Sequence, residues 1–251
     1  MSSRQDRAKR ITIPELCRRL RRVYGRVEFP EPMPVLDELI ATLLSQNTTD
    51  ANSDAAFDQL VRRFPTWDAV RRARVATIAE AIRPAGLQQQ KAARIKRILQ
   101  TLQKRHGGLS LEFLRAQPPA AAVAYLRSFP GVGPKTAACV LLFACRQSVL
   151  PVDTHVHRLS VRLALVPRRT TAEKAHDLLA RTVPARHVLE FHVLLIRHGR
   201  RVCHARQPQC PACPLIDACP EGLRRFEAGE FRGDWRPMRS VRNHGEVVPL
   251  S

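Results

Sequence analysis

The sequence predicts an all-α fold. Apolar residues recur at the three- and four-residue spacing of one helical face over residues 36–44, 57–64, 95–102 and 188–195. No stretch of useful length alternates apolar and polar side chains, which is the pattern of a half-buried strand. Most prolines fall between these stretches, where they do not interrupt a helix. We therefore expect one helix after another, without a sheet.

The ends of several helices carry recognisable signals. Gly107 follows the 95–102 stretch and is placed to terminate that helix, and Gly199 is expected to end the helix over 188–195. Two pairs have the spacing of a capping box: Thr77 with Glu80, and Thr170 with Glu173. Glycine and proline interrupt the end of the chain, so residues 225–251 are expected to form an irregular basic tail.

The charge balance points to a polyanionic partner. Lys and Arg number 42 against 22 for Asp and Glu, which leaves a net charge of +20. Nucleic acid is the simplest partner for such a surplus. An arginine-rich composition imposed by a GC-rich genome is the alternative, but it does not explain why acidic residues are scarce.

The sequence indicates no membrane segment. The longest apolar run extends from Ala138 to Cys145, well short of the ~20 residues that cross a bilayer. The first residues are polar and basic, without the apolar core of a secretory signal. We expect a protein of a reducing compartment, located in the cytoplasm and associated with a nucleoid of bacterial type.

Four cysteines lie close together, in the pattern C-x6-C-x2-C-x5-C: Cys203, Cys210, Cys213 and Cys219. One loop thus offers four thiolate ligands, which suits an iron–sulfur cluster. Zinc is the main competitor, although structural zinc sites usually have two close ligand pairs and only Cys210 and Cys213 form one. Two disulfides are a third interpretation, which the lack of a secretory signal disfavours.

A glycine-rich turn separates two expected helices: Phe129-Pro130-Gly131-Val132-Gly133-Pro134-Lys135. Proline is favourable at the first position of the second helix, and the glycines allow a tight turn that exposes backbone. The N–H groups of Gly131, Val132 and Gly133 can then point outward and, with the helix dipole, bind a phosphate. An ordinary glycine turn is the alternative. The charge surplus and the cysteine loop favour a helix-hairpin-helix that holds the DNA backbone.

Two residues near this turn are candidates for chemistry. Lys135 falls in the first turn of the second helix, where the positive end of the dipole is expected to lower the pKa of the amine. A partly neutral lysine is a nucleophile that forms Schiff bases with carbonyl carbons. A plain phosphate-binding lysine is the alternative, and the bare motif favours it. Asp153, in Val152-Asp153-Thr154-His155, is expected to cap a helix while it presents one carboxylate oxygen elsewhere.

These three motifs occur in the order and approximate spacing of the endonuclease III family, which the chain resembles over about residues 15–222. The cysteines match the family's cluster loop one for one, and His198-Gly199-Arg200 before them is similar too. Two shorter segments add to the resemblance: Leu44-Ser45-Gln46-Asn47-Thr48-Thr49-Asp50, and Gly86-Leu87 followed by Lys91-Ala92. The first segment has Q-N-T where A-Q-A is usual in the family.

The resemblance implies a two-lobed helix-hairpin-helix glycosylase fold with a [4Fe–4S] cluster. Residues 28–147 would form a six-helix barrel lobe that carries the hairpin, and residues 1–27 with 148–224 an iron–sulfur lobe. The four cysteines would hold the cluster, and Arg200 and Arg206 would meet DNA phosphates. Double-stranded DNA with damaged bases or abasic sites would be the partner, bound by a monomer.

The activity that the resemblance implies is that of a bifunctional DNA glycosylase and abasic-site lyase, acting on oxidised pyrimidines in base excision repair. The damaged base would be flipped out of the duplex. Leu87 would fill the vacated space, and Gln46 and Asn47 would contact the DNA there, with Asn47 against the orphaned partner base. Lys135 matches the family's catalytic lysine and Asp153 its catalytic aspartate.

Other functions fit the residues less well. Adenine glycosylases of the same superfamily generally lack the hairpin lysine and carry a catalytic glutamate where this chain has Ala41. A monofunctional glycosylase for other damaged or mismatched bases stays open, although Lys135 argues against it. A non-catalytic DNA-binding protein is a third alternative, but a pure phosphate binder has no need of Asp153.

Overall fold

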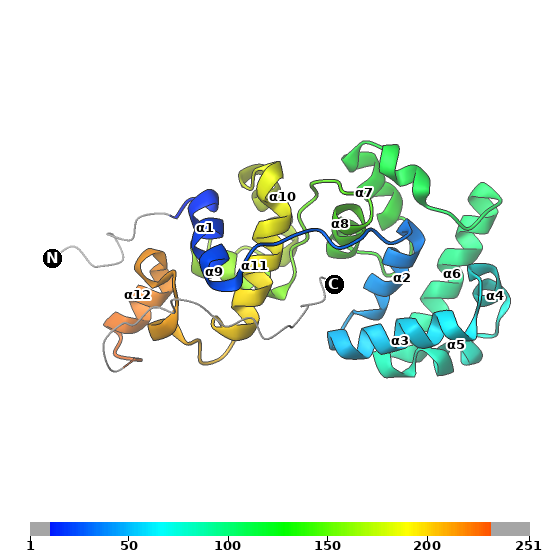
Figure 1. Cartoon of the computed structure of the whole chain (residues 1–251), viewed down its shortest axis with the longest axis horizontal. Coiled ribbons are helices and arrows are strands. Elements are labelled where there is room, and N and C mark those ends of the chain that lie inside the picture. Colours follow the sequence, from blue (N-terminus) through cyan, green and yellow to red (C-terminus); the bar gives the residue numbers. More distant parts are fainter. Residues whose placement is uncertain (1–10, 232–251) are drawn as a thin grey trace. The chain divides into compact units, whose positions relative to one another are not determined.

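The computed structural model describes residues 11–231, and every regular element within them is a helix, as the sequence predicts (Figure 1). The described residues divide into two compact units. Residues 30–151 are here called the hairpin unit, and residues 11–29 with 152–231 the cysteine unit. The hairpin unit thus begins at residue 30 and ends at residue 151, whereas the expected limits of that lobe were 28 and 147. The rest of the other lobe was expected over 148–224. A bilayer-spanning helix is absent from the described residues.

The hairpin unit is built around the helix α2, whose predicted apolar face lies in its core. Leu36, Leu39, Ile40, Leu43 and Leu44 are each at most 2% exposed, and α2 packs against α3, α6 and α8. Each such side chain stabilises the fold by about 1.5–3 kcal/mol through burial. The helices of this unit are α2 Val35–Leu44, α3 Asp50–Arg63, α4 Trp67–Arg72, α5 Val75–Ala81, η1 Arg83–Ala85, α6 Gln88–His106, η2 Glu112–Ala116, α7 Pro119–Arg127 and α8 Pro134–Phe143.

The cysteine unit is built around α11 (Val188–Arg201), which packs against α1 (Ile13–Tyr24) and α9 (Thr154–Arg162). The apolar side chains that predict α11 are buried at these contacts. The other helices of this unit are α10 Ala172–Thr182, η3 Ala185–His187, η4 Cys210–Ala212, η5 Ile216–Ala218 and α12 Pro220–Glu227.

The helix α12 corrects the expected start of the irregular tail. Residues 225–227 are helical, so the prediction of a tail from residue 225 is wrong for these residues. Glu221 lies at 2.9 Å from both Arg224 and Arg225, three and four positions later. Such pairs support a helix. Residues 232–251 of the expected tail lie outside the described residues.

Two predicted helix ends are confirmed and two predicted N-caps are wrong. Gly107 ends α6 in the left-handed region at φ 69°, and Pro134 opens α8. Thr77 lies inside α5 rather than before it. The helix α10 is capped by Thr171 and not by Thr170. Adjacent threonines offer the same hydroxyl, and sequence spacing alone does not select between them.

Gly199 lies inside α11 and does not end it, so this prediction is also wrong. A carbon added at position 199 would lie 2.5 Å from Nδ1 and 3.0 Å from Cβ of His155 on α9. The absence of a side chain therefore lets α9 and α11 approach each other closely. Glycine at 199 is a packing requirement and not a helix stop.

We predict that Gly199→Ala lowers the thermal unfolding midpoint by roughly 2–6 °C. Inside a helix this change normally gains about 1 kcal/mol, but here the added carbon overpacks the contact with His155, at a cost of about 1–3 kcal/mol. Gly108→Ala is the control, because nothing lies within 4 Å of a carbon added there. Circular dichroism melting curves measure both, and a raised midpoint for Gly199→Ala would contradict the packing role.

Glu38 is a carboxyl group buried in the hairpin unit. It is 9% exposed, and its Oε1 accepts a hydrogen bond from Oγ1 of Thr42 at 3.1 Å. Burial raises the pKa of Glu38 to about 7, against the opposing effects of Thr42 and of the charge on Lys135. The folded protein therefore holds this proton more tightly than the unfolded chain does.

Glu38→Gln is expected to stabilise the protein more at pH 8 than at pH 5. The folded state keeps the Glu38 proton up to a pKa of about 7, whereas the unfolded chain loses it near 4.5, so the free energy of unfolding falls as the pH rises through this window. Glutamine keeps the acceptor for Thr42 and carries no charge, and we expect a gain of about 1–3 kcal/mol at pH 8. Denaturant titrations at the two pH values measure it; an equal change at both would count against the assignment.

Candidate functional site

The turn that carries Lys135 is a hairpin between α7 and α8. Gly131 is exposed and has φ 78°, in the left-handed region that favours glycine. Gly133 caps α8 with φ −90° and ψ −179°, and Lys135 lies half-buried in the first turn of that helix. The side chain of Val132 is buried in the core, and its backbone N–H donates to the carbonyl oxygen of Phe129 at 3.3 Å. The prediction that this N–H points outward to a phosphate is therefore wrong for Val132, because the turn itself uses it. The start of α8 supplies N–H groups that have no partner within the helix, which suits an anion.

The hairpin is supported by Gln46, from the loop between α2 and α3. Its Nε2 donates to the carbonyl oxygen of Gly131 at 3.1 Å and to Oγ1 of Thr136 at 3.2 Å. Nη1 of Arg94 donates to Oε1 of Gln46 at 3.4 Å, and a carbon added at Gly131 would lie 2.7 Å from Cδ of Arg94. Gln46 and Arg94 thus hold the turn from the protein side. The predicted DNA contact of Gln46 stays a prediction, and no signal in the sequence identified Arg94.

Leu87 is exposed on a strained backbone. It precedes α6 with φ 48°, in the left-handed region, and it is 54% exposed. That conformation costs a residue other than glycine about 1–2 kcal/mol. A strained residue that displays a large apolar side chain to solvent is a candidate for function. The geometry suits the predicted wedge, and the role itself stays a prediction.

Lys91 joins the loop that precedes Leu87 to the loop that carries Gln46 and Asn47. Its Nζ donates to the carbonyl oxygens of Leu44 at 2.7 Å and Ala85 at 2.8 Å. Lys91 is 2% exposed, and burial lowers its pKa to about 8. Asn47 itself is exposed, with φ 55°. The sequence shows Lys91 only as part of a motif; the structure shows that one buried amine fixes both loops.

Asp153 is the N-cap of α9, as predicted. Its Oδ1 accepts a hydrogen bond from the backbone N–H of Val156 at 2.7 Å. The cap uses one of the two carboxylate oxygens. Asp153 belongs to the cysteine unit, whereas Lys135 belongs to the hairpin unit. Its predicted catalytic role stays a prediction.

The four cysteines of the C-x6-C-x2-C-x5-C pattern line one cavity at the end of the cysteine unit. The cavity is lined by the cysteines, by residues of the chain between α11 and α12, and by residues of α9 and α12: Arg162, Val202, Cys203, Pro208, Cys210, Cys213, Ile216, Cys219, Glu221, Gly222 and Arg225. No disulfide links the cysteines in the described residues. A carbon added at Gly222 would lie 2.5 Å from Cδ1 of Ile216 and 3.6 Å from Sγ of Cys219, so glycine here lets α12 close over the cavity.

Donors point at three of the four sulfur atoms. Nη1 of Arg162 lies 3.1 Å from Sγ of Cys203, and backbone N–H groups donate to Cys213 and Cys219, each at 3.4 Å. Such donors favour the thiolate form. Burial acts in the opposite direction and raises the pKa of Cys210 to about 11 and that of Cys219 to about 12. A cationic group bound between the sulfurs would offset that penalty, so the residues fit a metal centre.

The two arginines that the family resemblance assigns to DNA phosphates both lie on the surface. Arg200, in the last turn of α11, and Arg206, in the loop after Cys203, are both exposed. The intervening Arg201 is placed differently, with its guanidinium 5.7 Å from the ring centre of Tyr24. Exposure makes Arg200 and Arg206 accessible to a polyanion, and their contact with DNA stays a prediction.

Comparison with known proteins agrees with this arrangement. A family model described as HhH-GPD superfamily base excision DNA repair protein matches residues 40–185. A provisionally named DNA glycosylase of Arabidopsis thaliana is 42% identical over 196 residues, which are 74% of this chain and 67% of that protein. Endonuclease III of Thermotoga maritima is 34% identical over 194 residues, covering 77% of this chain and 86% of that protein.

Solved structures place the same fold on DNA. A trapped endonuclease III–DNA covalent intermediate aligns with a TM-score of 0.73 and 28% identity, over 90% of this chain and 100% of that one. The sequence match, the hairpin and the all-helical architecture thus agree. The chain belongs to the HhH-GPD superfamily of base excision DNA repair proteins, and within it to the endonuclease III-like enzymes, which are DNA glycosylases with abasic-site lyase activity.

Proposed function

We propose that this protein removes oxidised pyrimidines from duplex DNA and then cleaves the strand, with the amine of Lys135 as the nucleophile. The observation that carries the proposal is the place of Lys135. It stands half-buried in the first turn of α8, directly after the phosphate-sized hairpin turn. A DNA backbone held by the turn brings a sugar within reach of that amine. A structural relative, endonuclease III, has been trapped as a covalent intermediate with DNA, which supports a covalent reaction here.

The proposed reaction joins Lys135 to the sugar of the damaged nucleotide. The neutral Nζ forms a bond to C1′ as the glycosidic bond breaks, and the electron pair of that bond leaves with the base, which takes up a proton. The sugar ring opens to a Schiff base. Loss of the C2′ proton then expels the 3′ phosphate by β-elimination, and water hydrolyses the Schiff base to release Lys135.

The other site residues would prepare this step. A base inside the duplex is out of reach and must be flipped out, at a cost of a few kcal/mol. Leu87 would occupy the gap from its strained, exposed position, and Asn47 would face the orphaned partner base. The Asp153 carboxylate would accept the lysine proton or stabilise the positive sugar. The proposal requires both units to contact one nucleotide, with a single chain acting on the duplex.

We further propose that Cys203, Cys210, Cys213 and Cys219 hold a [4Fe–4S] cluster. When bound, such a cluster supplies four iron–thiolate bonds that crosslink the loop. The chain's own residues do the rest: Arg162 and the N–H groups at Cys213 and Cys219 stabilise the thiolates, and α12 closes the cavity. The ordered loop would then present Arg206 to phosphates. No catalytic step of the proposal involves the cluster.

Lys135→Ala is expected to abolish covalent trapping on abasic-site DNA. Borohydride reduces a Schiff base to a stable amine, so the unsubstituted protein forms a complex that survives denaturing electrophoresis. Lys104→Ala, which removes an exposed lysine of α6, is the matched control and should trap normally. If the unsubstituted protein forms no covalent complex with this DNA, the result favours a monofunctional glycosylase or a non-catalytic DNA-binding protein.

Asp153→Asn is expected to slow base release by ~10²-fold or more, the scale of a lost acid–base or electrostatic group. Asparagine is as good an N-cap as aspartate, so the bond to Val156 and the fold should persist. Single-turnover release of a thymine glycol base from a duplex measures the rate. Asp177→Asn, on an exposed position of α10, controls for the loss of one negative charge. An unchanged rate of base release in Asp153→Asn would show that Asp153 serves only as the N-cap of α9.

A further inference from the structure

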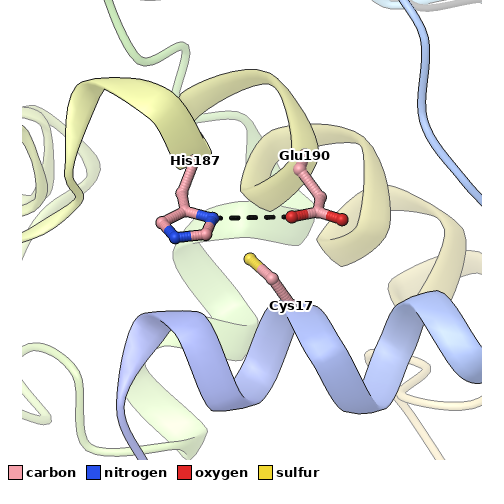
Figure 2. A group of neighbouring side chains, drawn as sticks. All are labelled: Cys17, His187 and Glu190. Carbon is pink, nitrogen blue, oxygen red and sulfur yellow. Dashed lines mark ion pairs between the residues drawn. The ribbon is translucent and has the colours of Figure 1, made fainter.

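Three potential metal ligands converge in the cysteine unit, outside the cysteine cavity. Cys17 comes from α1, His187 from η3 and Glu190 from α11. One ligand atom from each lies within 4.8 Å of the other two, and Figure 2 shows the three side chains pointing toward one another. None of these residues takes part in the proposed reaction or lines the four-cysteine cavity.

The contacts around this group leave one coordinating atom unsatisfied. Nδ1 of His187 is buried and has no hydrogen-bond partner among the described residues. Oε2 of Glu190 lies 3.5 Å from it. Nε2 of His187 is approached by the exposed Arg186 at 3.4 Å. A buried polar atom without a partner costs about 1–3 kcal/mol, so this nitrogen needs an explanation.

The carboxylate of Glu190 is shared between two neighbours. Its Oε1 lies 2.6 Å from Nε of Arg21, and its Oε2 lies 3.1 Å from Nη2 of the same arginine. The shorter contact is made by Oε1, and Oε2 faces His187. One oxygen can therefore bind a cation while the other keeps Arg21. A simple Arg21–Glu190–His187 polar network, with Cys17 as an apolar filler, is the competing interpretation.

Cys17 is unsuited to act as a nucleophile. The residue is fully buried, and burial, reinforced by the charge of Glu190, raises the pKa of its thiol to about 12. A Cys–His–Glu arrangement could otherwise suggest covalent catalysis, which requires an accessible thiolate. A bound cation supplies the positive charge that a buried thiolate requires.

We propose that Cys17, His187 and Glu190 form a binding site for a borderline-soft divalent cation, with Zn²⁺ as the best match. Zinc takes sulfur, imidazole nitrogen and carboxylate oxygen together, and it accepts water as a fourth ligand. Zinc–ligand bonds of about 2.0–2.3 Å place ligand atoms about 3–4 Å apart, so the three atoms close in by about an ångström. Coordination by Nδ1 puts the imidazole proton on Nε2, which turns Arg186 away.

The ion would join distant parts of the chain. Cys17 stands near the start of the described residues, whereas His187 ends η3 and Glu190 lies in the first turn of α11. The helix α1 already packs against η3 and α11. A zinc ion held by all three would act as a crosslink between α1 and α11. Because it binds the folded state in preference to the unfolded chain, it raises stability with the logarithm of the zinc concentration once that concentration exceeds Kd.

The number of zinc ions bound per chain tests the site. The full-length protein is used as purified, so that its cysteine loop keeps whatever metal it holds. The protein, Cys17→Ala and His187→Ala are incubated with ZnCl₂, passed through a desalting column, and analysed for zinc and iron. We expect the unsubstituted protein to carry one zinc ion per chain more than either variant, with equal iron in all three. Cys139→Ala, which removes a fully buried cysteine of the hairpin unit, is the matched control and should retain the zinc.

Thermal melting gives a second, independent readout. Zinc should raise the unfolding midpoint of the unsubstituted protein and of Cys139→Ala, and it should leave Cys17→Ala and His187→Ala unchanged. If Cys17→Ala fails to fold, His187→Ala decides alone, because His187 is at the surface edge of the site, with its side chain 15% exposed. The proposal would be overturned if the unsubstituted protein bound no more zinc than Cys17→Ala and His187→Ala.

Discussion

The position of Lys135 depends on a small set of hydrogen bonds beneath the hairpin. One backbone hydrogen bond, from the N–H of Val132 to the carbonyl oxygen of Phe129, closes the turn, and side chains add to its support. Gln46 supplies that support through the Gly131 carbonyl and Thr136. Arg94 covers the glycine, where a side chain carbon would collide with it. The first turn of α8, and the amine on it, follow from this arrangement.

Buried side chains also support the loops that are expected to contact the damaged nucleotide. Leu87 and Asn47 both hold left-handed backbone conformations, which cost energy unless the surrounding structure fixes them. Lys91 fixes both loops through the carbonyls of Leu44 and Ala85. Burial removes water from the amine of Lys91, and this loss of hydration lowers its pKa. Leu87 and Asn47, the exposed residues that would contact DNA, are thus held in place by the buried Lys91, which would not contact it.

Much of this fold was predictable, because each prediction rested on local chemistry. The apolar spacing in α2, the proline that opens α8 and the aspartate that caps α9 each act within a single helix. The errors arose where tertiary packing decides. Gly199 looks like a helix stop, yet its role is to admit His155 from another helix. Thr77 has the spacing of a cap but lies inside α5.

The support of the site was not predictable, because it consists of contacts between segments far apart in the sequence. Gln46 and Gly131, or Lys91 and Leu44, meet only in the folded hairpin unit. The sequence pattern gave the cysteines as a group, but not the donors from α9 and α12 that surround them. Likewise, Cys17 and Glu190 carry no shared motif, and only the packing of α1 on α11 brings them together.

The attachment site of the reduced DNA adduct tests the central claim most directly. Protein trapped on abasic-site DNA with borohydride is digested with nuclease and protease, and the modified peptide is sequenced by mass spectrometry. The account predicts a deoxyribose remnant on Nζ of Lys135 alone. A remnant on any other amine would contradict it, since the nucleophile would then lie elsewhere than at the start of α8.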